Sequence, residues 1–109
     1  MLNRGALIVR PAQPYLDWAA SLDDSGILPD PHDEVTIYLV PEYEDDLEAD
    51  KVLKRVYAEV FERELFGWCT DESLWPKRRT LALFKAWFTV EMHSIVEDLS
   101  NAPLVDDDI

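Results

Sequence analysis

The most regularly patterned stretch of the chain spans residues 46–66 and reads DLEADKVLKRVYAEVFERELF. Asp45 precedes it as a candidate N-cap with Glu48 three residues later, and Gly67 follows where a left-handed C-terminal cap is expected. Glu59 and Arg63 have the favourable i,i+4 order on the solvent-facing side. Its apolar residues recur three or four positions apart, which predicts one long helix over about 46–66; they are Leu47, Val52, Leu53, Val56, Tyr57, Val60, Phe61 and Leu65.

Two short apolar runs upstream of this helix predict strands. Residues 6–10 form the first run, which stops at Pro11, and residues 35–40 form the second, which stops at Pro41. Between them, residues 14–22 repeat apolar side chains at helical spacing after Pro14, which predicts a short helix. The prolines at positions 29 and 31 predict a loop before the second strand.

Downstream of the long helix, the segment 80–99 carries two competing patterns. Its apolar residues suit one long helix, whereas residues 90–96 alternate in polarity and are rich in strand formers. We predict a helix at 80–88 followed by a strand at 90–97. The alternative starts the strand near Phe84 and makes 94–99 a helix, because Ser94 and Glu97 have capping-box spacing. Residues 68–75 read as a loop between aromatic residues.

These elements follow one another as β-α-β-α-α-β, which predicts an α+β or small α/β fold. We expect a three-stranded mixed sheet with helices packed mainly on one face, in which a right-handed crossover can make the first two strands parallel. The 109 residues suit one domain, placed at 1–100. Residues 101–109 contain Pro103 and an acidic run at 106–108, which predicts a frayed acidic tail.

The charge and composition of the chain limit the classes of partner that it can bind. The chain has 23 Asp and Glu against 10 Lys and Arg, a net charge of -13, so binding to nucleic acid or to an anionic membrane is disfavoured. The first residues lack the apolar segment and cleavage site of a secretory signal, so we expect a cytoplasmic location and no membrane partner. Cys69 is the only cysteine, which excludes an intramolecular disulfide and predicts a buried, inert thiol.

Sequence motifs for common cofactors and reactions are absent. The three glycines form neither a phosphate-binding loop nor a dinucleotide fingerprint. The sequence also contains no serine-hydrolase elbow, zinc-protease helix or calcium-loop spacing. We therefore expect no cofactor and no resident metal, and the balance leans against an enzyme.

One pair of residues is a candidate for proton transfer or cation binding. Glu91 and His93 are two positions apart, so a strand places them on one face. Tyr38 or Thr36 of the neighbouring strand can stand near them, and Tyr38 or Asp71 is the candidate assisting group. A carboxylate, an imidazole and a phenol in one patch can move a proton or hold a cation. The alternative interpretation is a set of polar residues on the solvent side of a sheet. If 80–99 were one helix, the shared face would disappear.

Two further clusters have a simpler interpretation. Residues 30–34 include metal-ligating types, namely Asp30, His32, Asp33 and Glu34, but their prolines favour a solvated loop. The basic cluster 77–79 is interpreted as a solvated patch beside a helix.

Aromatic residues are the remaining candidates for binding. Four tryptophans, at positions 18, 68, 75 and 87, are predicted to pack in the core or at its edge. Because aromatic side chains also anchor interfaces, Trp75, Glu42 and Tyr43 are candidate partner-binding residues.

Three stretches carry a resemblance: IVRPAQPYLDW at 8–18, LVPEY at 39–43 and WCTDESLWP at 68–76, the last continuing through Trp87 to His93 and Ser94. They resemble a family of small acidic bacterial proteins of unknown function, some members of which carry the label VacJ. The resemblance spans nearly the whole chain and implies no activity, substrate or cofactor. The lipoprotein sense of that label is disfavoured, because no signal segment and no cysteine stand near the N-terminus.

Three functions remain open from the sequence. The first is a non-enzymatic interaction or regulatory module, monomeric or homodimeric, whose acidic surface meets a basic protein partner. The second is a small metal-binding or hydrolase-like site built on Glu91 and His93. The third is a DNA mimic that occupies a basic protein, which the interspersed Lys and Arg residues make less favoured than the first.

Overall fold

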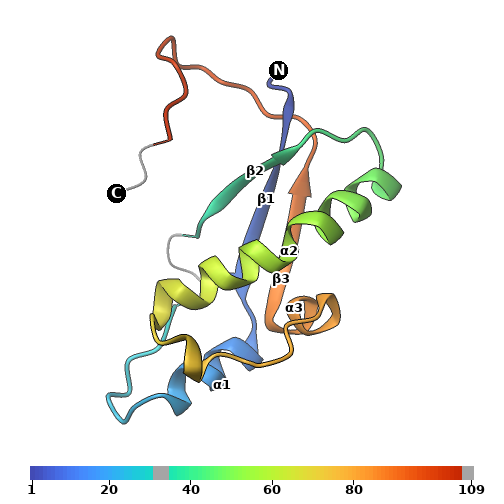
Figure 1. Ribbon diagram of the computed structural model, residues 1–109. Helices are drawn as coiled ribbons and strands as arrows, with labels where there is room; N and C mark the ends of the chain where they lie inside the picture. Colours follow the sequence, from blue (N-terminus) through green and yellow to red (C-terminus); the bar gives the residue numbers. More distant parts are fainter. Residues whose placement is uncertain (31–34, 107–109) are drawn as a thin grey trace.

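The computed structural model describes residues 1–30 and 35–106, and these form an α+β fold (Figure 1). The elements follow the expected β-α-β-α-α-β order, with one additional short 3-10 helix, η1, before the last α-helix. They are β1 (Arg4–Pro11), α1 (Gln13–Ser21), β2 (Ile37–Pro41), α2 (Asp46–Trp68), η1 (Glu72–Leu74), α3 (Leu81–Trp87) and β3 (Phe88–His93).

The sheet is antiparallel throughout, with β1 in the centre of the order β2-β1-β3. Leu7 of β1 pairs with Tyr38 of β2 on one side and with Met92 of β3 on the other. The mixed sheet expected from the sequence, with its first two strands parallel, is therefore wrong. The reason is the position of α1. Its Tyr15 ring packs 5.2 Å from Phe88, which pairs with the last residue of β1, so the chain enters β2 from the end at which β1 finished.

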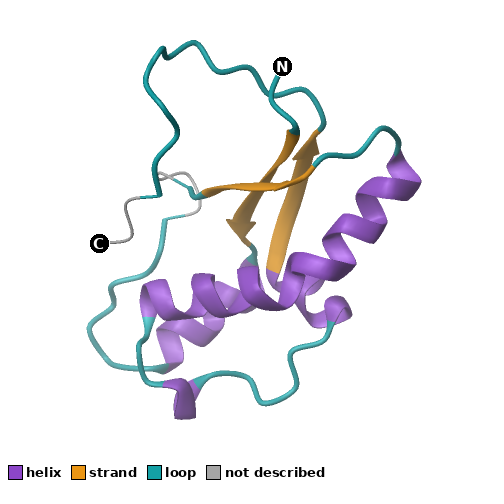
Figure 2. Ribbon diagram, turned by 45° about the horizontal axis from the view of Figure 1, so that its top comes forward, coloured by secondary structure: helices purple, strands orange, loops and turns teal. Residues whose placement is uncertain are grey.

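The helices lie mainly on one face of the sheet, as expected. α2 crosses the strands (Figure 1), and the turned view in Figure 2 shows the helices gathered along one side and one end of them. Leu7 and Val9 of β1 point toward the helices and are fully buried. On the opposite face, which we call the open face, Ile37 and Leu39 of β2 are 59% and 48% exposed.

An aromatic cluster fills the core beneath α2. Phe61 of α2 lies with its ring centroid 5.6 Å from Phe84 of α3 and 5.6 Å from Phe88 of β3, and all three side chains are buried. Trp18 and Trp87 pack against each other at 5.8 Å on the edge of this cluster. The prediction that these tryptophans pack at the core edge is confirmed.

The start of α2 is confirmed, and its predicted end is wrong. Asp45 Oδ1 accepts from the backbone N–H of Glu48 at 2.8 Å, and the Glu59–Arg63 ion pair forms at 3.1 Å. Gly67, however, lies inside the helix, which ends at Trp68 and is followed by Cys69 in an extended conformation. The indole N–H of Trp75 donates to the carbonyl oxygen of Cys69 at 2.8 Å, and this bond holds the extended exit that replaces a left-handed cap.

The division of 80–99 into a helix and a strand is confirmed with shifted ends. β3 begins two residues earlier than predicted and ends at His93 rather than at 97. The alternative, with a strand from near Phe84 and a helix over 94–99, is wrong, since Thr80 N-caps α3 through Leu83 N–H and 94–99 forms no helix. Leu2 N–H instead bonds to the carbonyl of Val96 at 2.7 Å.

Some predictions concern residues that the structure does not describe. His32, Asp33 and Glu34 of the possible metal-ligating loop lie outside the described residues, as do positions 107–109 of the acidic tail. Residues 101–106 form neither helix nor strand. Within the described ranges, every helix is too short or too polar to cross a lipid bilayer.

Candidate functional site

Glu91 and His93 share a face of β3, as the alternation predicted. Glu91 is paired with Ile8 and His93 with Ala6, which places both on the open face of the sheet. The imidazole Nε2 lies 2.9 Å from Glu91 Oε2, and both side chains are about half exposed. The pKa of Glu91 is lowered by this hydrogen bond and, to a smaller extent, by the charges of His93 and Arg10. The carboxylate therefore orients the imidazole, and both groups are accessible to solvent.

The groups expected to assist this pair lie elsewhere, and that part of the prediction is wrong. Tyr38 pairs with Leu7, so it faces the helices, on the opposite side of the sheet from Glu91, and β1 separates the two strands. Thr36 precedes β2 and stands at that same far edge. Asp71 N-caps η1, where its Oδ1 accepts from Ser73 N–H and Ser73 Oγ. Strand order, which the sequence does not reveal, caused the error.

No three His, Cys, Asp or Glu side chains gather as a metal site within residues 1–30 and 35–106. Cys69, expected to be buried, is only half-buried, and its Sγ lies 3.8 Å from the carbonyl oxygen of Asp71. The Glu91–His93 pair thus provides two polar groups on a solvated surface.

Trp75 is a core residue, which corrects its proposed role as an exposed partner anchor. Its side chain is 5% exposed, and the Arg79 guanidinium lies 5.7 Å from the ring centroid. Arg79 also pairs with Glu62 at 3.2 Å, so this member of the basic cluster at 77–79 has structural partners. Glu42 is exposed, and Tyr43 is half-buried against Gly5.

Tyr43 and His93, which the sequence placed in separate groups, line one small hollow at the end of β3. The hollow has a volume of about 280 Å³, and Asp45, Asp46 and Ile95 also line it. Tyr43 reaches this position because it packs over Gly5, where a Cβ atom would come within 2.7 Å of its ring. One residue from each group of candidates therefore lies beside the start of α2.

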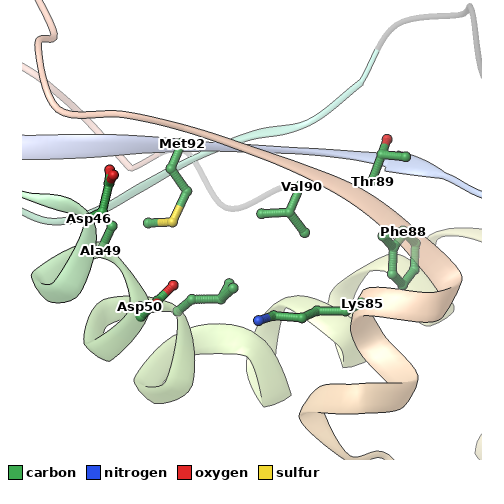
Figure 3. Close-up of a pocket in the computed structure, with 9 residues that line it drawn as sticks. Asp46, Ala49, Asp50, Lys85, Phe88, Thr89, Val90 and Met92 are labelled. Atoms are coloured by element: carbon green, nitrogen blue, oxygen red, sulfur yellow. The ribbon is translucent and has the colours of Figure 1, made fainter.

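A larger groove, of about 570 Å³, adjoins this hollow between α2, α3 and β3 (Figure 3). Val90 and Met92 point from β3 toward α2, and Lys85 reaches from α3 toward Asp50 (Figure 3). The apolar lining residues Leu53, Phe88, Val90 and Met92 are buried or half-buried and form the floor, whereas the charged residues Asp46, Asp50 and Lys85 are exposed and form the rim. The volume falls in the usual range of ligand-binding pockets.

The sequence contained part of the signal for this groove. Asp46 and Asp50 are four positions apart and lie on the same helical face as Leu53, while Val90 and Met92 alternate with Glu91 and His93 on the predicted strand. What the pattern could not supply was that the N-terminal half of α2 lies opposite β3. That placement follows from the tertiary packing alone.

β3 bounds the groove with an exposed strand edge. It occupies the end of the sheet order, and in the described part of the chain only β1 pairs with it. The outer edge of an end strand presents backbone N–H and C=O groups that can pair with another segment. The groove therefore combines an apolar floor, an acidic rim and an edge strand.

Glu64 is the residue of chemical interest that sequence reasoning missed. It is half-buried on α2, and Tyr38 donates its phenol O–H to Glu64 Oε2 at 2.6 Å while Tyr15 O–H donates to the Glu64 backbone carbonyl at 3.0 Å. Burial raises the pKa of Glu64, and the bond from Tyr38 partly opposes that rise. The signal was present, because Glu64 falls on the apolar stripe between Phe61 and Leu65.

Comparison with protein-family models, with curated proteins and with solved structures finds no match for this chain. The resemblance to a family of small acidic bacterial proteins therefore stays a prediction.

Proposed function

We propose that the chain is a non-enzymatic interaction module that binds a basic protein segment in the groove between α2 and β3. The observation that carries the proposal is the composition of the groove, in which Asp46 and Asp50 stand above a floor that includes Leu53, Val90 and Met92. Apolar contacts at the centre of an interface supply affinity, and charges at its rim supply steering and specificity.

The surroundings of the groove support a basic partner. The segment from 42 to 50 reads EYEDDLEAD, and all six of its carboxylate side chains are exposed. With a net charge of -13 on the whole chain, the long-range field attracts positive groups and repels anionic ones. A basic segment approaching the start of α2 is therefore favoured before any contact forms.

The Glu91–His93 pair supports the hydrolase-like or metal-binding alternative less well. Both side chains are about half exposed, and the structure puts Tyr38 on the opposite face of the sheet. A general base is effective where its geometry is fixed and water is partly excluded. On the open face of β3 only the first condition is met.

The experiment is affinity capture from a cell extract on the immobilised chain, at about 0.05 M and about 0.5 M NaCl, because this range of salt shortens the screening length several-fold. We expect basic proteins at low salt and weaker capture at high salt. The double substitution Asp46→Asn with Asp50→Asn lowers capture. The matched control, Asp24→Asn with Glu72→Gln, removes the same charge from two exposed sites outside the groove, one in the loop after α1 and one in η1, and leaves capture unchanged.

Two outcomes oppose the proposal. Equal capture by the groove variant and its control would show that the partner binds outside the groove. Captured proteins that are released by duplex DNA but not by the groove substitutions would favour the DNA-mimic alternative.

A further inference from the structure

We infer that the segment bound in the groove is an extended strand that pairs antiparallel with the outer edge of β3, with an apolar side chain over Val90 and a lysine or arginine beside Asp46. The inference rests on the proposed function and adds the conformation and residue pattern of the partner.

The edge of β3 and the groove lie side by side. Four residues of β3, from Phe88 to Met92, line the groove, and β1 covers the other edge of the strand. A strand added to a sheet lies about 4.8 Å from its neighbour, so a segment paired with β3 extends over the groove. Its alternate side chains then point to the same side of the sheet as Val90 and Met92.

The charges along the groove give the bound segment a polarity. Asp46 stands near Met92, at the C-terminal end of β3, whereas Lys85 stands closer to Phe88 and Val90 (Figure 3). A basic residue is therefore attracted at the Met92 end and repelled near Lys85. In an antiparallel pair, the N-terminal part of the ligand lies beside Met92. The basic residue should thus stand two positions before the apolar one.

The spacing agrees with the side chains of β3. Val90 and Met92 are two residues apart, so their positions are about 6.8 Å apart along the strand. Two ligand side chains of the same face have the same separation. In a ligand with a basic residue at position i and apolar residues at i+2 and i+4, the charge lies beside Asp46 and away from Lys85. The two apolar side chains then cover the groove floor.

The probe is a capped peptide of sequence Lys-Thr-Val-Thr-Ile-Thr, titrated into the 15N-labelled protein and followed by amide chemical shifts. We expect shifts at residues 88–93 and 46–53. The reversed peptide, Thr-Ile-Thr-Val-Thr-Lys, has the same composition and is expected to bind about threefold or more weakly, because its base lies near Lys85 in the antiparallel register.

Backbone pairing is tested with two N-methylated peptides. In one, the amides of Lys, Val and Ile are methylated, and in the other those of the three Thr residues. An edge-paired strand directs alternate amides toward β3, so one peptide loses binding about tenfold or more and the other keeps it within about twofold. Met92→Lys, which places a charge over the groove floor, also abolishes binding, and its circular dichroism spectrum checks the fold.

The outcomes separate the inference from the proposed function. If both methylated peptides bind as the parent does, or if no peptide binds while Asp46→Asn with Asp50→Asn still lowers capture of a basic protein, strand addition is overturned and the proposed function stands. If neither peptide binding nor protein capture responds to the groove substitutions, the inference and the proposed function are both contradicted. Loss with one methylated set and with Met92→Lys supports strand addition.

Discussion

Glu64 joins α2 to the sheet through Tyr38, and its burial makes the stability of the fold depend on pH. Because its folded pKa is raised above the ordinary 4.5, the stability it contributes is fully present below that pH and is lost as the pH rises through the folded pKa. We predict that Glu64→Gln removes this loss and leaves the protein more stable than wild type near neutral pH. Urea unfolding at several pH values measures it. Equal pH profiles for the two proteins would contradict the prediction.

Tyr38→Phe provides the complementary test of the same contact. It leaves Glu64 Oε2 without the phenol donor, which should cost about 1–3 kcal/mol in unfolding free energy at neutral pH. Since the bond from Tyr38 lowers the pKa of Glu64, its loss also moves the pH-dependent decline to higher pH. In the Glu64→Gln background, Tyr38→Phe should cost less than it does in the wild type, because both changes act on one contact.

Gly5 is required by a close approach rather than by its backbone angle. A Cβ atom at this position would lie 2.7 Å and 3.1 Å from two ring carbons of Tyr43 and 3.3 Å from the carbonyl oxygen of His93. We predict that Gly5→Ala destabilises the fold by about 1–3 kcal/mol, the usual cost of overpacking. Guanidinium unfolding checks the value. Adding Tyr43→Ala removes the clash and should recover part of the loss, whereas strictly additive costs would show that the ring is not the obstacle.

At this scale, periodicity predicted which side chains share a face and failed to predict which faces meet. Glu91 and His93 were correctly placed together because a strand alternates. Tyr38 was misplaced because the partner of each strand depends on long-range packing. Glu64 could have been found as a carboxylate on an apolar stripe, but its hydrogen bond to Tyr38 requires the crossing of α2 over β2.

Among the helices, α2 extends two residues beyond its predicted end at 66. Gly67 was expected to end the helix, yet it lies one residue before the last helical position, and the space that a methyl group would take there is open. We predict that Gly67→Ala stabilises the protein by roughly 0.5 kcal/mol, because alanine loses less backbone entropy in a helix. Thermal unfolding measures the change. A destabilised variant would mean that Gly67 adopts a left-handed cap in solution.

The boundaries of the helices and strands show why local sequence signals fail to predict where these elements end. Asp45 could be predicted as an N-cap because the contact spans only three residues, whereas Thr80, which caps α3 by the same contact, was taken as the first residue of that helix. The exit of α2 depends on Trp75, six residues away, and the end of β3 at His93 depends on the length over which β1 pairs. The antiparallel direction of β2 likewise depends on where α1 packs. The N-cap of α2 was therefore predictable, whereas strand direction and the ends of helices and strands were not.

At the scale of the whole molecule, the excess of carboxylates acts on the fold as well as on partners. A net charge of -13 on one small domain repels itself, and an exposed ion pair such as Glu59 with Arg63 offsets little of this repulsion. The repulsion is strongest where acids crowd, along the exposed segment 42–50 beside the groove. Salt that screens this repulsion should therefore stabilise the free protein and weaken its capture of a basic partner.

We predict that raising NaCl from about 0.02 M to about 0.5 M increases the melting temperature by a few degrees, which corresponds to about 1 kcal/mol for a domain of this size. Scanning calorimetry measures the shift, and sucrose of equal osmolality serves as the control for general solute effects. Asp50→Lys lowers the negative charge by two and should reduce the salt response. A melting temperature that falls with salt would show that attractive ion pairs outweigh the repulsion, and the acidic field would then be too weak to steer a partner.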